Sequence, residues 1–185
     1  EELLAYFKRA EAEAALAKAA QIYTRLARSD NPALAAQANL QLAGLDLTAR
    51  RYDQAIARLR TLPGKEELLT RLEAKISPLR AELARETKPS PQKLRRLQRE
   101  QRKIDDVRSQ PDITAQALFQ LATAFLQTRR LDEARLVFRH VARFAPPAYA
   151  GPAEQQVILT YALQGRSAEA DRLLADYQKK HPEQK

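Results

Sequence analysis

Two stretches near the C-terminus of this chain share one spacing of large and small residues. Ala134 and Ala170, which take the same place in the two stretches, are 36 residues apart. A sequence repeat of about 34 residues is typical of stacked helical hairpins. Such stacks usually bind other molecules rather than catalyse reactions, so the repeat constrains function as well as fold. The shared positions are Leu118, Leu121, Ala122, Phe125, Ala134, Phe138 and Pro146 in the first stretch, and Val157, Tyr161, Gly165, Ala170, Leu174 and Pro182 in the second.

The composition favours an all-helical chain. Hydrophobic residues make up 44% of the sequence but aromatic residues only 6%, because alanine and leucine supply most of the apolar content. Both are strong helix formers. Only 4 glycines are present, so tight β-hairpin turns are scarce. No segment alternates β-branched and polar residues, and we therefore expect helices throughout.

Proline and glycine divide the chain into segments of hairpin length. We predict a single helical repeat domain over residues 1–185, in which Arg50–Asp53 forms one turn, with Asp53 able to cap the second helix, and Pro146–Gly151 links two repeats. The expected segments are 1–31 (an atypical hairpin or one long helix), 32–62 (a repeat), 63–111 (a degenerate repeat or inserted helices, with a break or kink near Pro78), 112–146 (a repeat) and 151–182 (a repeat).

Much of the positive charge lies in one predicted helix, residues 92–109. The net charge is +9, and residues 88–108 hold eight basic and three acidic residues. At 100° per residue, the apolar side chains share one side of this helix and the basic ones share the other. The expected basic patch consists of Arg95, Arg96, Arg99, Arg102 and Lys103.

The repeated positions resemble those of the tetratricopeptide repeat family. Counted from Ala115, the large, small and aromatic positions of that family fit, with Val141 as a mild departure. The repeats counted from Ala36 and Gly151 fit less fully; Asn39, Asp46, Glu154 and Ile158 depart from the pattern. The resemblance implies an all-α, right-handed α-solenoid of stacked antiparallel helical hairpins. It also implies that the aromatic residues at these positions are core: Phe125, Phe138 and Tyr161.

In that family the first helix of each hairpin lines a concave groove. Here those positions carry amides and apolar groups, without the lysine, asparagine and arginine clamp that grips a C-terminal carboxylate. We therefore expect an extended segment or a helix of another protein as the partner; the alternative is that a neighbouring repeat covers Phe119 and Leu126. The predicted groove residues are Gln37, Leu40, Leu47, Gln116, Phe119, Thr123, Leu126, Gln127, Gln155 and Leu159.

Residues that carry chemistry are few. The chain has no cysteine, and neither of its histidines, His140 and His181, has a partner at metal-ligand spacing. No phosphate-binding loop, dinucleotide fingerprint or nucleophile elbow occurs. We therefore predict no catalytic residues, no metal and no cofactor, and the chain is interpreted as non-enzymatic.

The sequence thus predicts a scaffold that docks a partner protein in a multiprotein assembly. By analogy with similar cysteine-free arrays, we expect a bacterial periplasmic or outer-membrane setting such as exopolysaccharide export, with a cytoplasmic location as the alternative. The alternative function is a polyanion-binding module that takes an acidic polysaccharide or nucleic acid on residues 92–109. Nucleic acid is the less favoured polymer, because no aromatic residue lies among the arginines. Any membrane contact is expected through parts absent from this chain, such as a removed signal peptide or anchor.

Overall fold

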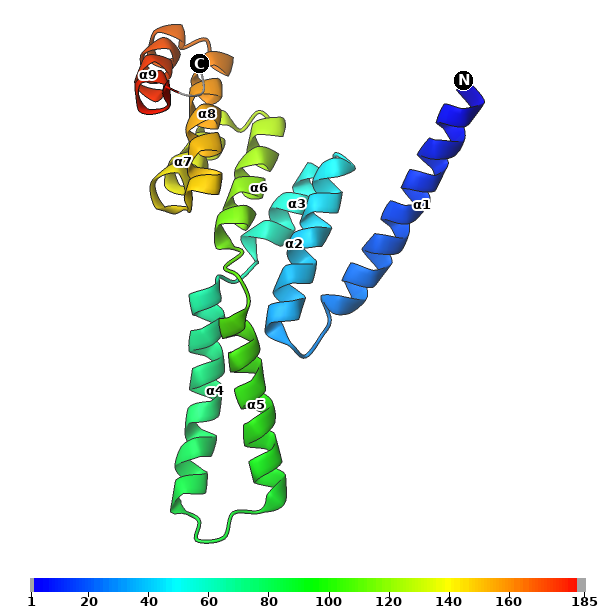
Figure 1. Cartoon of the computed structure of the whole chain (residues 1–185), viewed down its shortest axis with the longest axis vertical. Helices are drawn as coiled ribbons and strands as arrows, with labels where there is room; N and C mark the ends of the chain where they lie inside the picture. The colour runs from blue at the N-terminus through cyan, green and yellow to red at the C-terminus, as the bar shows by residue number, and fades with distance from the viewer. Residues whose placement is uncertain (1, 183–185) are drawn as a thin grey trace. The chain divides into compact units, whose positions relative to one another are not determined.

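The computed structural model describes residues 2–182, and side chains from residue 11 onward. Within these residues the chain forms nine α-helices and no strand (Figure 1), which confirms the all-helical prediction. The helices are α1 (Glu2–Leu26), α2 (Pro32–Thr48), α3 (Tyr52–Arg60), α4 (Lys65–Arg85), α5 (Pro91–Ser109), α6 (Thr114–Gln127), α7 (Leu131–Phe144), α8 (Pro147–Leu163) and α9 (Ser167–Lys180).

The helices belong to two compact units. The first comprises Glu1–Leu42 and Leu62–Thr114, and the second Ala43–Thr61 and Ala115–Lys185. The boundary falls inside α2, so the last turns of α2 join α3 and the four C-terminal helices in the second unit. That both units form one repeat domain stays a prediction from the sequence.

Three hairpins of the second unit close with the same turn. The residue after the first helix has a positive φ in each case: 58° at Arg50, 60° at Arg129 and 75° at Gly165. Its N–H donates three residues back, to the carbonyls of Leu47, Leu126 and Ala162 at 3.0, 3.1 and 3.0 Å. The next N–H donates five residues back, at 2.8, 2.9 and 3.0 Å. These paired bonds form the Schellman motif, which satisfies the last carbonyls of a helix and reverses the chain.

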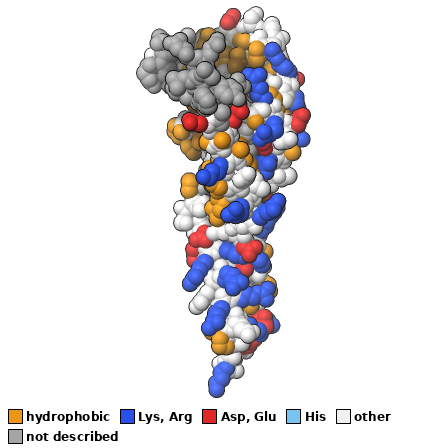
Figure 2. Space-filling view, turned by 90° about the vertical axis from the view of Figure 1, so that its right-hand side faces the viewer, with side chains coloured by type: hydrophobic (Ala, Val, Ile, Leu, Met, Phe, Trp, Pro, Cys, Tyr) orange, Lys and Arg blue, Asp and Glu red, His pale blue; other side chains and the backbone are white. Residues whose placement is uncertain are grey.

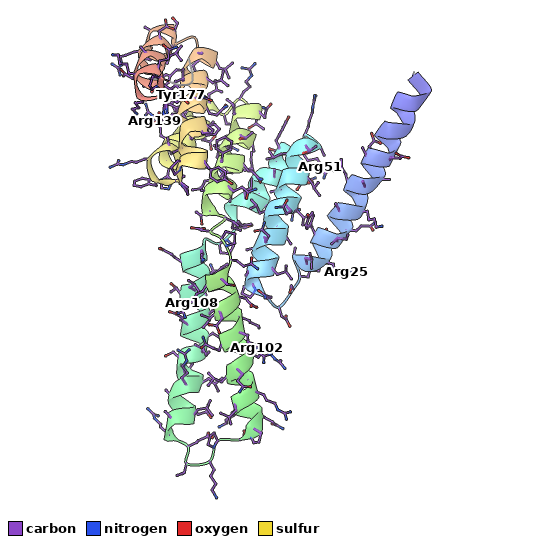
Figure 3. All side chains as sticks on the ribbon, viewed as in Figure 1. Arg25, Arg51, Arg102, Arg108, Arg139 and Tyr177 are labelled. Carbon is purple, nitrogen blue, oxygen red and sulfur yellow. The ribbon has the colours of Figure 1, made fainter. Side chains whose placement is uncertain are left out.

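An arginine follows the positive-φ residue in every one of these turns, and its side chain returns to the residue five places back. Arg51 donates to buried Asp46 at 3.0 and 2.8 Å, and Figure 3 labels it at the end of α2. The guanidinium carbon of Arg130 lies 4.5 Å from the ring centroid of Phe125, and that of Arg166 lies 4.7 Å from the ring centroid of Tyr161. Each turn is thus locked by an ion pair or a cation–π contact.

Small residues lie where the paired helices of the second unit meet. Ala43 and Ala55 are fully buried, as are Ala122 and Ala134, and each pair is twelve residues apart. Such residues let two helix backbones approach closely. In the third hairpin the place of Ala122 is taken by Ile158, and only its partner, Ala170, is small. Large side chains fill the space between hairpins: Phe138 is 0% exposed, and Phe125 and Tyr161 are buried as the sequence predicted.

The longest hairpin of the first unit consists of α4 and α5. Its apolar seam is narrow, with Ile76, Ile104 and Val107 as the buried residues. Helix α4 continues through Pro78 without a break, and α5 begins after Ser90, whose side chain accepts a hydrogen bond from the Lys93 N–H. Segment 63–111 is therefore one long pair of helices.

Several predicted boundaries differ from the structure. Residues 2–26 form one helix, so the long-helix alternative holds for the N-terminus. The predicted linker Pro146–Gly151 is wrong, because α8 already begins at Pro147 and continues through Pro152. Proline is favoured in the first turn, where its missing N–H has no intrahelical partner. Asp53 does not cap α3; Arg51 occupies the N-cap position and makes no side-chain capping bond.

The repeated turn predicts a backbone effect at Gly165. An added Cβ would meet no atom within 4 Å, so Gly165→Ala tests the cost of a positive φ without a steric clash. We expect a loss of about 1 kcal/mol in the free energy of unfolding, measured by urea denaturation. The matched change Arg129→Gly removes a strained residue from the equivalent turn and should not lose stability. Equal losses in both variants would contradict this account of the turn.

Candidate functional site

The basic face of α5 is largely open to solvent. Arg95, Arg96, Arg99 and Arg102 are exposed, and among the residues that the structure describes none of them makes a direct ion pair, although the charge of Arg96 contributes to lowering the pKa of Glu82. Figure 2 shows lysine and arginine side chains along the α4–α5 hairpin, interspersed with acidic ones. Arg102 also lines a shallow hollow of about 420 Å³ with Arg80 of α4. Four of the five predicted patch residues therefore stand ready to contact an anion.

Lys103, the fifth predicted residue, belongs instead to the seam between α4 and α5. Its side chain is only 18% exposed, and its Nζ lies 3.3 Å from Oε1 of Glu100. Oε2 of the same carboxylate has no hydrogen bond of good geometry but lies 3.3 Å from the Nζ of Lys75. Because Glu100 is 12% exposed and holds Lys103 in place, that lysine is part of the hairpin's packing rather than of a free surface.

Two carboxylates of this seam have lowered pKa values. Burial raises the pKa of Glu100, but hydrogen bonds and charge interactions with Lys103 and Lys75 outweigh it, so the pKa lies below its ordinary value of about 4.5. A hydrogen bond from Lys93 at 2.5 Å and its positive charge lower the pKa of Glu82. The charged forms of both groups therefore favour the folded hairpin.

Several residues of the predicted groove are buried in packing. Leu40 is 0% exposed and Leu126 is 9% exposed, so neither offers a surface to a partner. Phe119 is half-buried, and its ring lies 5.4 Å from that of Phe138 and 6.2 Å from that of Tyr149. The prediction is corrected for Leu40 and Leu126, which occupy the core because the apolar face of a first helix also packs against its own hairpin. Phe119 packs against these rings but keeps part of its surface open, so its role in binding stays a prediction.

The other predicted groove residues are more accessible. Half-buried positions are Gln37, Leu47, Gln116 and Thr123, and exposed positions are Gln127, Gln155 and Leu159. The Thr123 hydroxyl donates to the carbonyl of Phe119 at 2.8 Å, and the Gln155 side-chain amide donates to the Tyr177 hydroxyl at 2.9 Å. Gln37 and Leu40 belong to the first unit and the rest to the second, and their role in binding remains a prediction.

A groove that the sequence did not predict lies along α7, α8 and α9 of the second unit. Its volume is about 560 Å³, and Figure 3 labels Arg139 and Tyr177 beside it. Ile158, the larger residue at a normally small position, forms part of its wall. The lining residues are Arg139, Ala142, Arg143, Glu154, Val157, Ile158, Leu173, Asp176, Tyr177, Lys179 and Lys180.

The charges around this groove do not balance. Glu154 lies 3.2 Å from Lys180 and 3.8 Å from His181, and Asp176 lies 3.9 Å from Lys179. The two arginines of α7 that line the groove, Arg139 and Arg143, in contrast have no carboxylate partner among the described residues. Arg139 donates to the Tyr161 hydroxyl at 2.6 Å, and the guanidinium of Arg143 lies 5.1 Å from the ring of Phe144.

A sequence signal for this site was present but incomplete. Arg139 and Arg143 are four residues apart and therefore share a helix face, beside the aromatic Phe144. That pairing points to a cationic stripe on α7. The sequence pattern did not indicate that α9 would leave the surface beside these arginines open. The groove between the helices depends on how the side chain of Ile158 packs.

Chemistry-bearing clusters are not found in the described part of the chain. Among the described side chains, those of residues 11–182, no group of three or more histidine, cysteine, aspartate or glutamate residues is arranged to hold a metal ion. His140 is exposed, 4.9 Å from the ring of Phe144. Among the described helices, none combines the length and apolar character needed to cross a membrane.

Comparison with known proteins gives one distant structural likeness. No family model matches the chain, and no curated protein matches it. A crystal structure of a kinesin light chain from Podosopora anserina, with nearly identical tetratricopeptide-like repeats, is similar at 14% identity and a TM-score of 0.37; the match covers 97% of this chain and 91% of that one. At this TM-score and identity, the likeness says nothing about the partner or function of this chain.

The lowered pKa values predict how stability depends on pH. A carboxylate whose pKa falls on folding stabilises the native state above its unfolded pKa, and that contribution is lost as the pH falls through the folded value. Glu100→Gln should therefore reduce the unfolding free energy at pH 7 and flatten its decline below about pH 4.5. Urea denaturation at a series of pH values measures this. Glu66→Gln, an exposed change at the start of α4, is the control, and an equal flattening there would contradict the role of Glu100.

Proposed function

We propose that this chain is a non-enzymatic scaffold that docks a partner protein through the second unit. The observation that carries the proposal is the open groove along α7, α8 and α9. It combines an apolar floor with polar and charged groups at its edge, and its volume of about 560 Å³ lies in the range of sites that accept side chains of a ligand. The exposed residues at predicted groove positions, Gln127 and Leu159, offer further contacts on the same unit.

The unit is suited to this task because its hairpins are rigidly closed. The Schellman turns satisfy the helix ends, and the arginines at positions 51, 130 and 166 fix each turn to the preceding helix. Helix faces held in this way present their side chains in one arrangement before a partner arrives. Less conformational entropy is then lost on association.

A second candidate function is supported by the free arginines of α5. Arg95, Arg99 and Arg102 are exposed without a carboxylate partner in the described residues, and a polyanion such as an acidic polysaccharide would pair with them. A multiprotein assembly of the bacterial envelope, with a role in exopolysaccharide export, would bring a partner protein and such a polymer to one chain. That setting, in the periplasm or at the outer membrane, is our proposal from composition and charge.

The docking function predicts which face of α8 a partner touches. Ile158→Arg places a charge in the groove, whereas Leu159→Arg places it on the exposed face that sequence reasoning selected. Proteins crosslinked to the wild-type chain in an extract of the source cells should be lost with Ile158→Arg and kept with Leu159→Arg. Crosslinks are identified by mass spectrometry. If the crosslinks are lost only with Leu159→Arg, the partner binds the face that the sequence predicted. If the wild-type chain gives no specific crosslink, the docking proposal is contradicted.

The polyanion function predicts a salt-dependent signature on α5. The triple change Arg95→Gln, Arg99→Gln and Arg102→Gln should elute from a heparin column at clearly lower salt than the wild type, because fewer counterions are exchanged on binding. The double change Arg71→Gln and Lys179→Gln, at cations that already pair with Glu67 and Asp176, is the control and should elute at higher salt than the triple variant. Elution of the triple variant at the wild-type salt concentration would exclude α5 as the polymer site.

A further inference from the structure

The groove along α7, α8 and α9 carries enough detail to indicate the chemistry of its occupant. Ala142, Val157, Ile158 and Leu173 give it apolar walls, and Tyr177 adds an aromatic ring. Apolar walls of this kind accept aliphatic or aromatic side chains, which gain free energy by leaving water. A simple polymer of charges would leave this surface uncovered.

The rim selects the charge of the occupant. The two carboxylates at the groove already face lysines, with Glu154 at 3.2 Å from Lys180 and Asp176 at 3.9 Å from Lys179. Arg139 and Arg143 have no such counterion among the side chains of residues 11–182. Arginine binds carboxylates with two parallel hydrogen bonds, so this pair favours an acidic partner.

The spacing of the arginines favours a helical partner. They are four residues apart on α7 and therefore lie about 6 Å apart along its axis. Two carboxylates four residues apart on another helix have the same separation, so a helix lying along α7 can meet both arginines at once. Leu136, which is 72% exposed, precedes Arg139 by three residues and Arg143 by seven, so it shares their helix face and offers further apolar area beside the groove.

We infer that this groove binds an acidic amphipathic helix of a partner protein. Apolar side chains of that helix, spaced by three or four residues, enter the space between α7 and α9, and two carboxylates one turn apart pair with Arg139 and Arg143. The inference rests on the proposed docking function and adds the chemical class of the partner.

A peptide-display selection tests the inference directly. A library of random peptides of helical length is selected on the immobilised wild-type chain, and enriched peptides are synthesised for fluorescence anisotropy. We expect enrichment of aspartate or glutamate pairs four residues apart beside leucine, isoleucine or phenylalanine. The change of Arg139→Gln with Arg143→Gln should weaken binding about tenfold, because two ion pairs at a half-open surface are lost.

Matched controls separate the groove from general charge. Arg95→Gln with Arg99→Gln removes two arginines at the same spacing from α5 and should leave peptide affinity unchanged. Unlike Arg139→Gln, the single change Arg143→Gln breaks no hydrogen bond of the described residues, so it removes the charge without removing an internal contact of that kind. Thermal melting checks that each variant is folded. Exchanging glutamate for glutamine in the peptide repeats the test on the unaltered protein.

Each remaining outcome overturns the inference in a recognisable way. If the enriched peptides carry no acidic residues but their binding is still lost with Ile158→Arg, the groove docks a partner and the inference of an acidic helix is wrong. Polyglutamate that binds as tightly as the enriched peptides would show general attraction to a polyanion. A dimer in sedimentation that Arg143→Gln dissociates would make a second copy the occupant. No enrichment, together with crosslinks that ignore Ile158→Arg, would remove both the inference and the proposed function.

Discussion

The turn that closes each hairpin of the second unit is the contact on which the rest of that unit depends. A residue with a positive φ reverses the chain, and the N–H groups of that residue and the next satisfy the last carbonyls of the helix. The arginine that follows then reaches back to the residue five places earlier, which is Asp46, Phe125 or Tyr161. The backbone is the same in all three turns, while the side-chain contact is an ion pair in one and a cation–π contact in two. Aspartate can therefore stand where the family pattern has an aromatic residue, because Arg51 and Arg58 supply its counter-charges at 2.8 and 3.3 Å.

The α4–α5 hairpin is stabilised differently. Its seam holds few buried apolar residues, and ion pairs such as those of Glu100 with Lys75 and of Arg108 with Glu73 connect the two helices, while Lys103 pairs with Glu100 within α5. Exposed ion pairs each contribute little to stability, so the hairpin gains more from the network than from any one pair. This arrangement commits Lys103 to the structure and leaves the arginines on the opposite face free. The same helix thus serves both packing and a charged surface.

The two candidate surfaces differ in the partner that each would accept. The arginine face of α5 offers positive charge along an exposed helix. Such a face suits an anionic polymer that is bound through its charge and not through its sequence or shape. The groove along α7, α8 and α9 offers charge beside an apolar wall, which suits a protein segment with both properties. A scaffold that carries both could hold a protein and an anionic polymer on separate units. The expected envelope location would make such a pairing useful, and it remains a proposal.

Much of the fold could be read from the sequence, because helix formation and the crossing of paired helices depend on local spacing. The close approach at Ala122 and Ala134, and the burial of Phe125, Phe138 and Tyr161, follow from positions that recur in each repeat. The candidate site was less predictable. Leu40, Leu126 and Phe119 lie at positions that could face either a partner or a neighbouring helix, and only packing decides between these. The groove beside Ile158 likewise depends on how closely α7 and α9 approach, which is set by side chains far apart in the chain. The sequence by itself determined the helices, the turns of the repeats and the distribution of charge. Tertiary structure decided which charges are paired and which surface stays open, because pairing and exposure are properties of contacts between helices.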